Sequence, residues 1–211
     1  MSQQRKTRVL CVYKALNLLN KNLLKMNIRK AEISDSKYIA PILLLAMEDI
    51  IYKFIAKKDY AAAKDFLEYF ASRDNNQYSY QNCFVAEENN EIIGAVNIYN
   101  GSDIEALRAP IVDYVRKNYN PEFNPEFETR AGEFYIDSLG VNPNHQGKGI
   151  GSKILRFLID EYVHKNQQTL GLLVEEDNPL AKSLYLKLGF EIVGEKTLVG
   201  KKLEHLQISH K

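Results

Sequence analysis

The chain has 211 residues, 28 Lys and Arg against 27 Asp and Glu, a formal net charge of +1 and 45% hydrophobic residues. This length favours one domain with one sizeable core. The near-neutral balance lacks the basic excess typical of nucleic-acid binding, and no apolar run approaches the ~20 residues of a membrane span. The two cysteines and four histidines are scattered, without metal-site spacing. We expect a cytoplasmic globular protein with no metal, nucleic-acid or membrane partner.

Residues 1–25 differ in composition from the rest of the chain. They contain six Lys and Arg residues and no acid, and the first carboxylate is Glu32. A mitochondrial-type targeting segment is one interpretation, and an upstream start or a loosely attached extension is the other. Met26 begins a pattern typical of a first strand and helix. We therefore expect residues 1–25 to lie outside the core and residues 26–211 to form a single domain.

The first half of that domain predicts alternating helices and strands. A strand is expected at residues 27–31, followed by helices over 34–54 and 59–72 and a hairpin of strands at 83–86 and 92–99. A helical piece within residues 102–119 is expected to be kinked at, or to begin at, Pro110. The Pro- and Glu-rich residues 120–132 then predict a long loop, which is typical of a lid, a partner site or a disordered segment.

The stretch EFYIDSLGV, residues 133–141, carries a change of phase. Phe134 and Ile136 alternate as in a strand, and so do Leu139 and Val141, but the second pair starts three residues after Ile136. Because side chains alternate between the two faces of a strand, this spacing would move the second apolar pair to the other face. The strand keeps all four on one face only if it contains one extra residue, which is a β-bulge. We place the bulge near residues 138–140, where it would leave backbone N–H groups unpaired. The alternative is a strand that ends at Asp137.

The stretch HQGKGIG, residues 145–151, stands directly before an amphipathic helix. The first N–H groups of a helix have no internal partner and attract anions, and glycine lets a phosphate approach the backbone closely. A phosphate-binding turn is therefore expected, with a ligand-free tight turn as the alternative. The spacing fits neither the Walker loop nor the dinucleotide fingerprint, but it does fit Gln146-x-x-Gly149-x-Gly151.

A second set of signals follows at residues 169–209. A buried strand is expected at 169–174. Asn178 and Pro179 then predict the start of a helix, and Gly189 predicts its end. Two further strands are expected at 190–193 and 203–209.

Together these residues resemble the GNAT superfamily of N-acetyltransferases. The resemblance covers roughly residues 26–211. It is most specific where the bulged strand, the Gln146-x-x-Gly149-x-Gly151 turn and Asn178-x-x-Ala181-x-x-x-Tyr185-x-x-x-Gly189-Phe190 follow one another in the family's order. It implies an α+β fold in which a mostly antiparallel sheet of about seven strands, flanked by helices, splays between strands 4 and 5. That opening would admit acetyl-CoA as co-substrate.

The resemblance also implies roles for individual residues. The backbone of Leu139 and Val141 would pair with the pantetheine arm, and Asn178, Ala181 and Lys182 would lie beside the cofactor. Tyr185 would face the thioester sulfur, although a core aromatic residue fits the same helical position. The pyrophosphate would be held by the turn that comprises Gln146, Gly147, Lys148, Gly149, Ile150, Gly151 and Ser152.

The chemistry requires a base and a proton donor. A primary amine has a pKa of ~10.4 and must lose a proton before it attacks a thioester. Glu133 is the first candidate for the base and Asp137 the second, with two solvent-facing strand residues as the alternative. Tyr185 is the candidate donor to the departing thiolate.

The acceptor amine is not identified by these motifs. Small amines, amino acids, aminoglycosides and protein amines all stay open, and so do a homodimer and a non-catalytic CoA-binding sensor with the same fold. The segments before the bulged strand carry acids and tyrosines that would suit a cationic amine: Glu48, Asp49, Tyr52, Tyr114, Tyr119, Glu122, Glu126 and Glu128.

Overall fold

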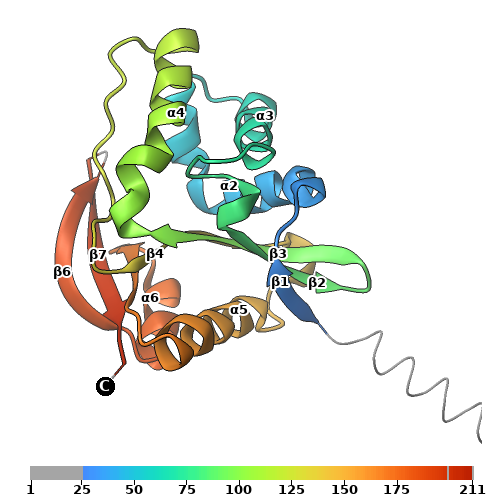
Figure 1. The fold of residues 1–211 in the computed structure, drawn as a ribbon, viewed down its shortest axis with the longest axis vertical. Coiled ribbons are helices and arrows are strands. Elements are labelled where there is room, and N and C mark those ends of the chain that lie inside the picture. Colours follow the sequence, from blue (N-terminus) through green and yellow to red (C-terminus); the bar gives the residue numbers. More distant parts are fainter. Residues whose placement is uncertain (1–25, 199, 211) are drawn as a thin grey trace, which may run out of the picture.

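A computed structural model describes residues 26–198 and 200–210, which form a seven-stranded sheet with helices on both faces (Figure 1). The strand order is β1-β2-β3-β4-β5-β7-β6, and every neighbouring pair is antiparallel except β4–β5. The expected mixed, mostly antiparallel sheet is confirmed. The predictions made for residues 1–25 fall outside the described residues. The strands are β1 (Asn27–Lys30), β2 (Cys83–Glu88), β3 (Glu91–Asn100), β4 (Phe134–Val141), β5 (Leu170–Glu175), β6 (Glu191–Leu198) and β7 (Lys201–Ile208).

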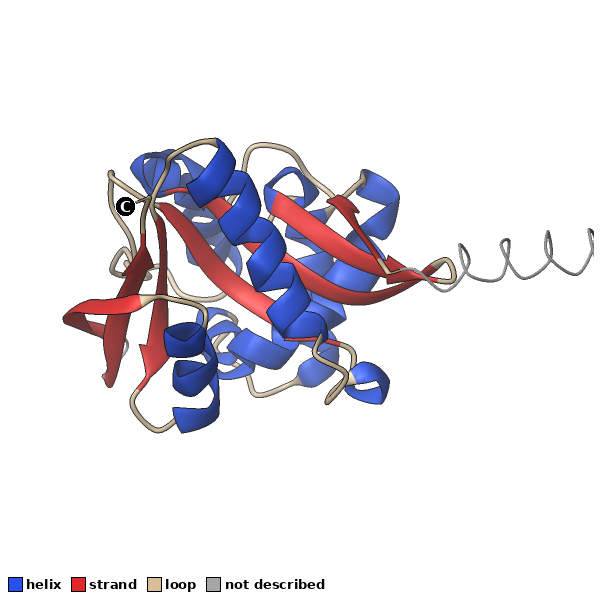
Figure 2. Cartoon of the chain, turned by 90° about the horizontal axis from the view of Figure 1, so that it is seen from below, coloured by secondary structure: helices blue, strands red, loops and turns tan. Residues whose placement is uncertain are grey.

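The helices form one layer on each face of the sheet (Figures 1 and 2). The first layer covers one face with α2 (Ser36–Phe54), α3 (Tyr60–Ala71) and α4 (Ile104–Asn118). The second covers the other face with α5 (Ile150–Leu158), the π-helix Ile159–Lys165 and α6 (Pro179–Lys187). Within the part of the chain that the structure describes, no helix is long and apolar enough to cross a membrane.

Each layer has its own hydrophobic core. Side chains alternate between the two faces of a strand, and β2 follows this rule: Cys83 and Val85 belong to the core under α2 and α3, whereas Phe84 and Ala86 belong to the core under α5. Phe190, just before β6, completes the second core. The sheet is therefore buried on both sides in its middle.

Side-chain caps mark the starts of α3 and α6. The Asp59 carboxylate accepts a hydrogen bond from the Ala62 N–H at 3.1 Å, and the Asn178 side chain accepts one from the Ala181 N–H at 3.2 Å. Both residues cap helices, and the cap at Asn178 is the one expected from the sequence. Of the two alternatives for Pro110, a helix that begins at this residue is wrong. Helix α4 begins at Ile104 and continues through Pro110, and Ile111 directly after the proline is fully buried in the core.

The predicted bulge in β4 is confirmed, at a slightly different position. Along β3, Asn97 pairs with Ser138 but Ile98 pairs with Ile136, so Asp137 is the extra residue. Strand β4 also pairs with β5 at three positions only, the last being Ile136 with Leu172. Asp137 therefore lies where β4 separates from β5.

Candidate active site

The two central strands separate beyond the bulge. Strand β5 stays paired with β7 through Glu175, while β4 continues to Val141 with β3 as its only neighbour among the described strands. The side chains of Leu139 and Val141 are half-buried against the core under α5. The Gln146 side-chain amide donates a hydrogen bond to the Val141 carbonyl at 3.2 Å. The expected open strand edge is present between β4 and β5.

The glycine turn leads from this edge into α5. Gly147 and Gly149 have φ values of 75° and 74°, and a Cβ atom on either would meet nothing within 4 Å. The backbone N–H groups of residues 147–149 donate no hydrogen bond within the described chain, and no side chain caps α5. Gly151 packs on the strand edge, where a Cβ atom would lie 3.5 Å from Leu139 Cδ2. Free N–H groups at an uncapped helix start can receive an anion.

Helix α6 borders the other side of the opening. Lys182 forms an ion pair with Glu204 of β7 at 2.6 Å, so its charge is already partnered. The ring of Tyr185 packs against the core under α5, 5.9 Å from the ring centroid of Phe190. Burial raises the pKa of Tyr185, and its hydroxyl has no hydrogen-bond partner among the described residues. The hydroxyl is therefore protonated at neutral pH and free to donate.

Glu133 is buried and fully hydrogen-bonded rather than open to a substrate. Its carboxylate accepts hydrogen bonds from Thr129 at 2.7 Å and from His205 and Gln207 at 2.8 Å each, and its side chain is 1% exposed. Burial alone would raise the pKa of Glu133, but the bonds from His205, Thr129 and Gln207 outweigh it and lower the pKa. A carboxylate held in this way is a weak base. The alternative of a solvent-facing Glu133 is wrong.

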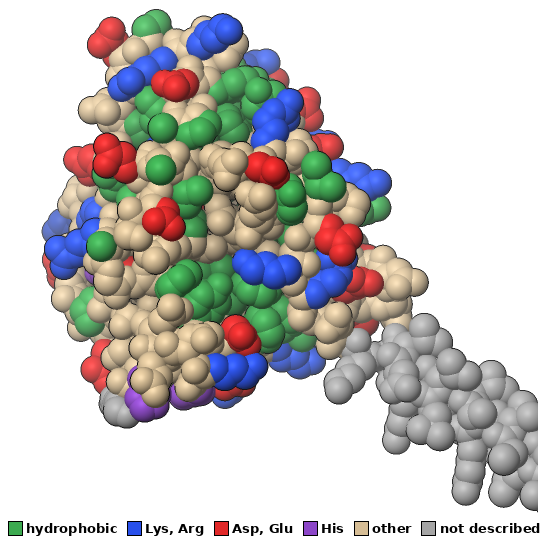
Figure 3. Space-filling view, viewed as in Figure 1, with side chains coloured by type: hydrophobic (Ala, Val, Ile, Leu, Met, Phe, Trp, Pro, Cys, Tyr) green, Lys and Arg blue, Asp and Glu red, His purple; other side chains and the backbone are tan. Residues whose placement is uncertain are grey.

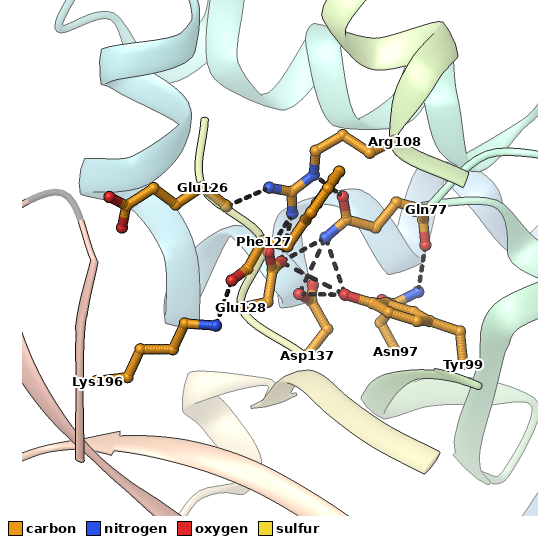
Figure 4. Close-up of polar contacts among 9 residues, drawn as sticks. All are labelled: Gln77, Asn97, Tyr99, Arg108, Glu126, Phe127, Glu128, Asp137 and Lys196. Atoms are coloured by element: carbon orange, nitrogen blue, oxygen red, sulfur yellow. Dashed lines mark hydrogen bonds and ion pairs between the residues drawn. The ribbon is translucent and has the colours of Figure 1, made fainter. Parts of the chain in front are cut away.

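Asp137 occupies a different environment, in a polar cluster at the bulge (Figure 4). Its Oδ1 accepts hydrogen bonds from the Gln77 side-chain amide and the Tyr99 hydroxyl, both at 3.1 Å. Its Oδ2 is buried and has no partner within the described chain. Burial, followed by the negative charge of Glu128, raises the pKa of Asp137 well above its usual range, and Arg108 opposes the rise. Asp137 thus combines a buried oxygen that accepts no hydrogen bond from the described residues with a high proton affinity, to which its contact with the Glu128 carboxyl group contributes.

Four residues of this cluster come from other segments and surround the bulge. Gln77 precedes β2, Tyr99 lies on β3, Arg108 on α4 and Glu128 in the loop of residues 119–133. The Arg108 guanidinium forms a buried ion pair with Glu128. The same loop crosses to β6, where the Lys196 ammonium donates to the Phe127 carbonyl (Figure 4). The long loop expected from the sequence is therefore an ordered cover over this part of the sheet.

Sequence reasoning did not single out Gln77, Tyr99 or Arg108. Arg108 had a detectable signal, because it occupies an apolar stripe of α4 that also contains Ile104, Ile111 and Val115. Glu128 appeared only among eight acids and tyrosines proposed to suit a cationic amine. Of those eight, it alone contributes its side chain to the cluster at the bulge, whereas Tyr114 packs against Phe66 and other rings of the α3–α4 layer.

Comparisons with known proteins agree with this architecture. The model of the acetyltransferase (GNAT) family matches residues 48–190. An uncharacterized N-acetyltransferase of Bacillus subtilis (strain 168), YhfO, is 29% identical over 166 residues, which are 79% of this chain and 90% of that protein. N-alpha-acetyltransferase RimI of Mycobacterium tuberculosis is 39% identical over 62 residues, 29% of this chain and 37% of that protein. The aligned part thus spans little more than a third of RimI.

Solved structures extend the likeness to nearly the whole fold. An N-acetyltransferase from Staphylococcus aureus Mu50 superimposes with a TM-score of 0.76 at 22% identity, covering 86% of this chain and 100% of that chain. The protein yncA from Salmonella typhimurium, solved with its cofactor acetyl-CoA, has a TM-score of 0.53 at 20% identity, covering 89% of this chain and 95% of that chain. At these identities the likeness concerns the fold alone.

Proposed function

This chain belongs to the acetyltransferase (GNAT) family, and we propose from that premise that it transfers an acetyl group from acetyl-CoA to a primary amine by direct attack in a ternary complex. The observation that carries the proposal is the bulge at Asp137. It brings together an open strand edge, a helix start whose N–H groups have no partner within the described chain, and a carboxyl group whose buried Oδ2 accepts no hydrogen bond from the described residues. Acetyl-CoA would supply the acetyl group as an activated thioester.

Two parts of the chain would bind acetyl-CoA. The free backbone edge of β4 at Leu139 and Val141 offers hydrogen bonds as another strand would. Asn178, Ala181 and Lys182 would line the opposite wall. The turn and the start of α5 would hold the pyrophosphate through the backbone of Gln146, Gly147, Lys148, Gly149, Ile150, Gly151 and Ser152. Lys148 is exposed, and its ammonium lies 3.4 Å from the Asn144 carbonyl, so it can turn toward a phosphate.

Asp137 would act as the base. When it takes a proton, an N–H bond of the acceptor ammonium breaks, the electron pair stays on the nitrogen, and the proton joins the carboxylate. A base with a raised pKa is better matched to this task than one with a lowered pKa. This comparison favours Asp137 over Glu133. Glu133, with its three hydrogen bonds, would instead hold the start of β4 against β7.

Tyr185 would donate its hydroxyl proton to the departing thiolate. The hydroxyl is protonated at neutral pH and has no partner within the described chain, which suits a donor that waits for a substrate. Its packing against the core under α5 would fix the position of the ring.

Release of free thiol from acetyl-CoA in the presence of a panel of amines tests this proposal. The panel should include polyamines, amino acids, aminoglycosides and peptides with a free N-terminus. We expect at least one amine to raise thiol release above the rate without acceptor. Tight binding of acetyl-CoA with no amine-dependent release from the whole panel would contradict the proposal and favour the CoA-binding sensor.

A further inference from the structure

We propose that Glu128 is a positioning residue that acts through Asp137. The two neighbouring carboxyl groups together take up a single proton, which Asp137 accepts, and Arg108 fixes Glu128 at the bulge. This inference rests on the proposed function for its catalytic meaning, but its physical content belongs to the protein without substrate. The loop of residues 119–133 would then do more than cover the sheet, because it places the negative charge of Glu128 beside the proposed base.

The two carboxyl groups share their hydrogen-bond donors. The Gln77 amide nitrogen lies 2.8 Å from Glu128 Oε1 and 3.1 Å from Asp137 Oδ1. The Tyr99 hydroxyl lies 3.1 Å from the same Asp137 oxygen and 3.4 Å from the same Glu128 oxygen. Two carboxylates that share a site resist double ionisation, so one of them takes up a proton more readily than an isolated acid.

Arg108 organises the rest of the cluster. It is 4% exposed, and its Nε donates to the Gln77 side-chain oxygen at 2.8 Å, which turns the Gln77 amide nitrogen toward the carboxyl groups. Its Nη1 donates to the Glu126 carbonyl at 3.0 Å, and its Nη2 binds the Glu128 carboxylate. Because Glu128 is bound to Arg108 while Asp137 Oδ2 has no partner among the described residues, the free position for the proton is on Asp137.

The other titratable groups around Asp137 remain neutral. They are the hydroxyls of Tyr78, Tyr99 and Tyr135 and the thiol of Cys83. Burial raises the pKa of all three tyrosines well above the usual value and raises the pKa of Cys83 to about 12. The charges that act on Asp137 in this cluster are therefore those of Glu128 and Arg108. The former raises and the latter lowers the pKa of Asp137.

Substitution of Glu128 tests the pair directly. Glu128→Gln keeps the shape but removes the negative charge, so the titration midpoint of Asp137 should fall by about one pH unit or more. The midpoint is measured by NMR on the ligand-free protein with ¹³C-labelled aspartate, and the Asp137 signal is assigned by its loss in Asp137→Asn. Glu126→Gln is the matched control, because it removes an exposed acid from the same loop and should leave the midpoint unchanged.

A conservative variant guards against a general loss of structure. Glu128→Asp keeps the charge, so its midpoint should stay closer to that of the wild type than that of Glu128→Gln does. If Glu128→Gln folds and leaves the titration midpoint of Asp137 unchanged, the proposed coupling between Glu128 and Asp137 is contradicted, whether or not the variant is active. If the midpoint falls as expected but no amine in the panel is acetylated, the carboxyl pair stands and the proposed transferase function fails. With an active acceptor, the acid limb of kcat/KM should move to lower pH by the same amount.

Discussion

Single residues at the opening owe their chemistry to their neighbours rather than to their type. Glu133 and Asp137 are four positions apart and both carry carboxyl groups, yet one accepts three hydrogen bonds and the other keeps an oxygen unpartnered within the described chain. The pKa of Glu133 is lowered and that of Asp137 is raised. Their different environments separate a structural anion from a candidate base.

Tyr185→Phe tests the proposed proton donor. The change keeps the ring and its packing against Phe190 but removes the hydroxyl, so kcat should fall by ~10²-fold with little change in acetyl-CoA affinity. Tyr162→Phe is the matched control, because Tyr162 is a half-buried tyrosine on the same face of the sheet whose ring packs against Phe134. An unimpaired Tyr185→Phe enzyme would remove Tyr185 from the mechanism.

At the scale of elements, the proposed site depends on the start of α5 and on the paired part of β4 and β5. Before α5, the N–H groups of the glycine turn have no partner because no side chain of the described residues caps this helix. Where β4 and β5 are paired, Gly171 of β5 has no side chain, and the Glu133 carboxylate fills the space that a Cβ atom would take. Each feature depends on the absence of a side chain.

Gly149→Val tests the turn. A β-branched residue at a φ of 74° is strained, and its side chain would enter the space offered to a phosphate, so acetyl-CoA affinity should fall at least about tenfold in calorimetric titration. Lys148→Ala should cost less, because an exposed charge is screened by salt. Gly200→Val, at a φ of 80° in the β6–β7 turn, controls for strain alone. Equal affinity in the Gly149 and Gly200 variants would contradict a phosphate-binding turn.

Gly171→Ala tests the packing of Glu133. An added Cβ atom would lie 1.6 Å from Glu133 Oε2, so the carboxylate must move and give up hydrogen bonds. The free energy of unfolding should fall by about 1.5–3 kcal/mol, the range for hydrogen bonds to a charged group. In a Glu133→Ala background the same change should cost much less, which a double-mutant cycle of urea denaturation measures. Strict additivity would show that the two residues do not interact.

At the scale of the whole molecule, the sheet places the glycine turn before α5 and the polar cluster around Asp137 at the two ends of the same strand segment, residues 137–141 of β4. Charged side chains of both signs are mixed over the face in Figure 3, in keeping with the near-neutral composition. The polar cluster at the bulge instead draws on segments far apart in the chain. Gln77 and Asp137, for example, are 60 residues apart.

Separation along the chain decides which features could be predicted from the sequence. The cap at Asn178 and the existence of a bulge follow from local patterns, and the mostly antiparallel sheet of about seven strands follows from the resemblance. The phase slip predicted a bulge near residues 138–140, whereas the extra residue is Asp137. The apolar pattern alone does not determine which residue between Ile136 and Leu139 is unpaired. The contacts of Arg108 depend on how α4 lies over β4, which no local pattern encodes.

The pH dependence of kcat/KM in the wild type and in Asp137→Asn, with the most active amine of the panel, tests the central claim most directly. The wild-type rate should rise through an acid limb set by Asp137. Asp137→Asn should lack that limb and should approach the wild-type rate only near the pKa of the amine itself, where the acceptor is already neutral. Glu133→Gln should keep the limb. A limb that persists in Asp137→Asn and disappears in Glu133→Gln would contradict the account and assign the base to Glu133.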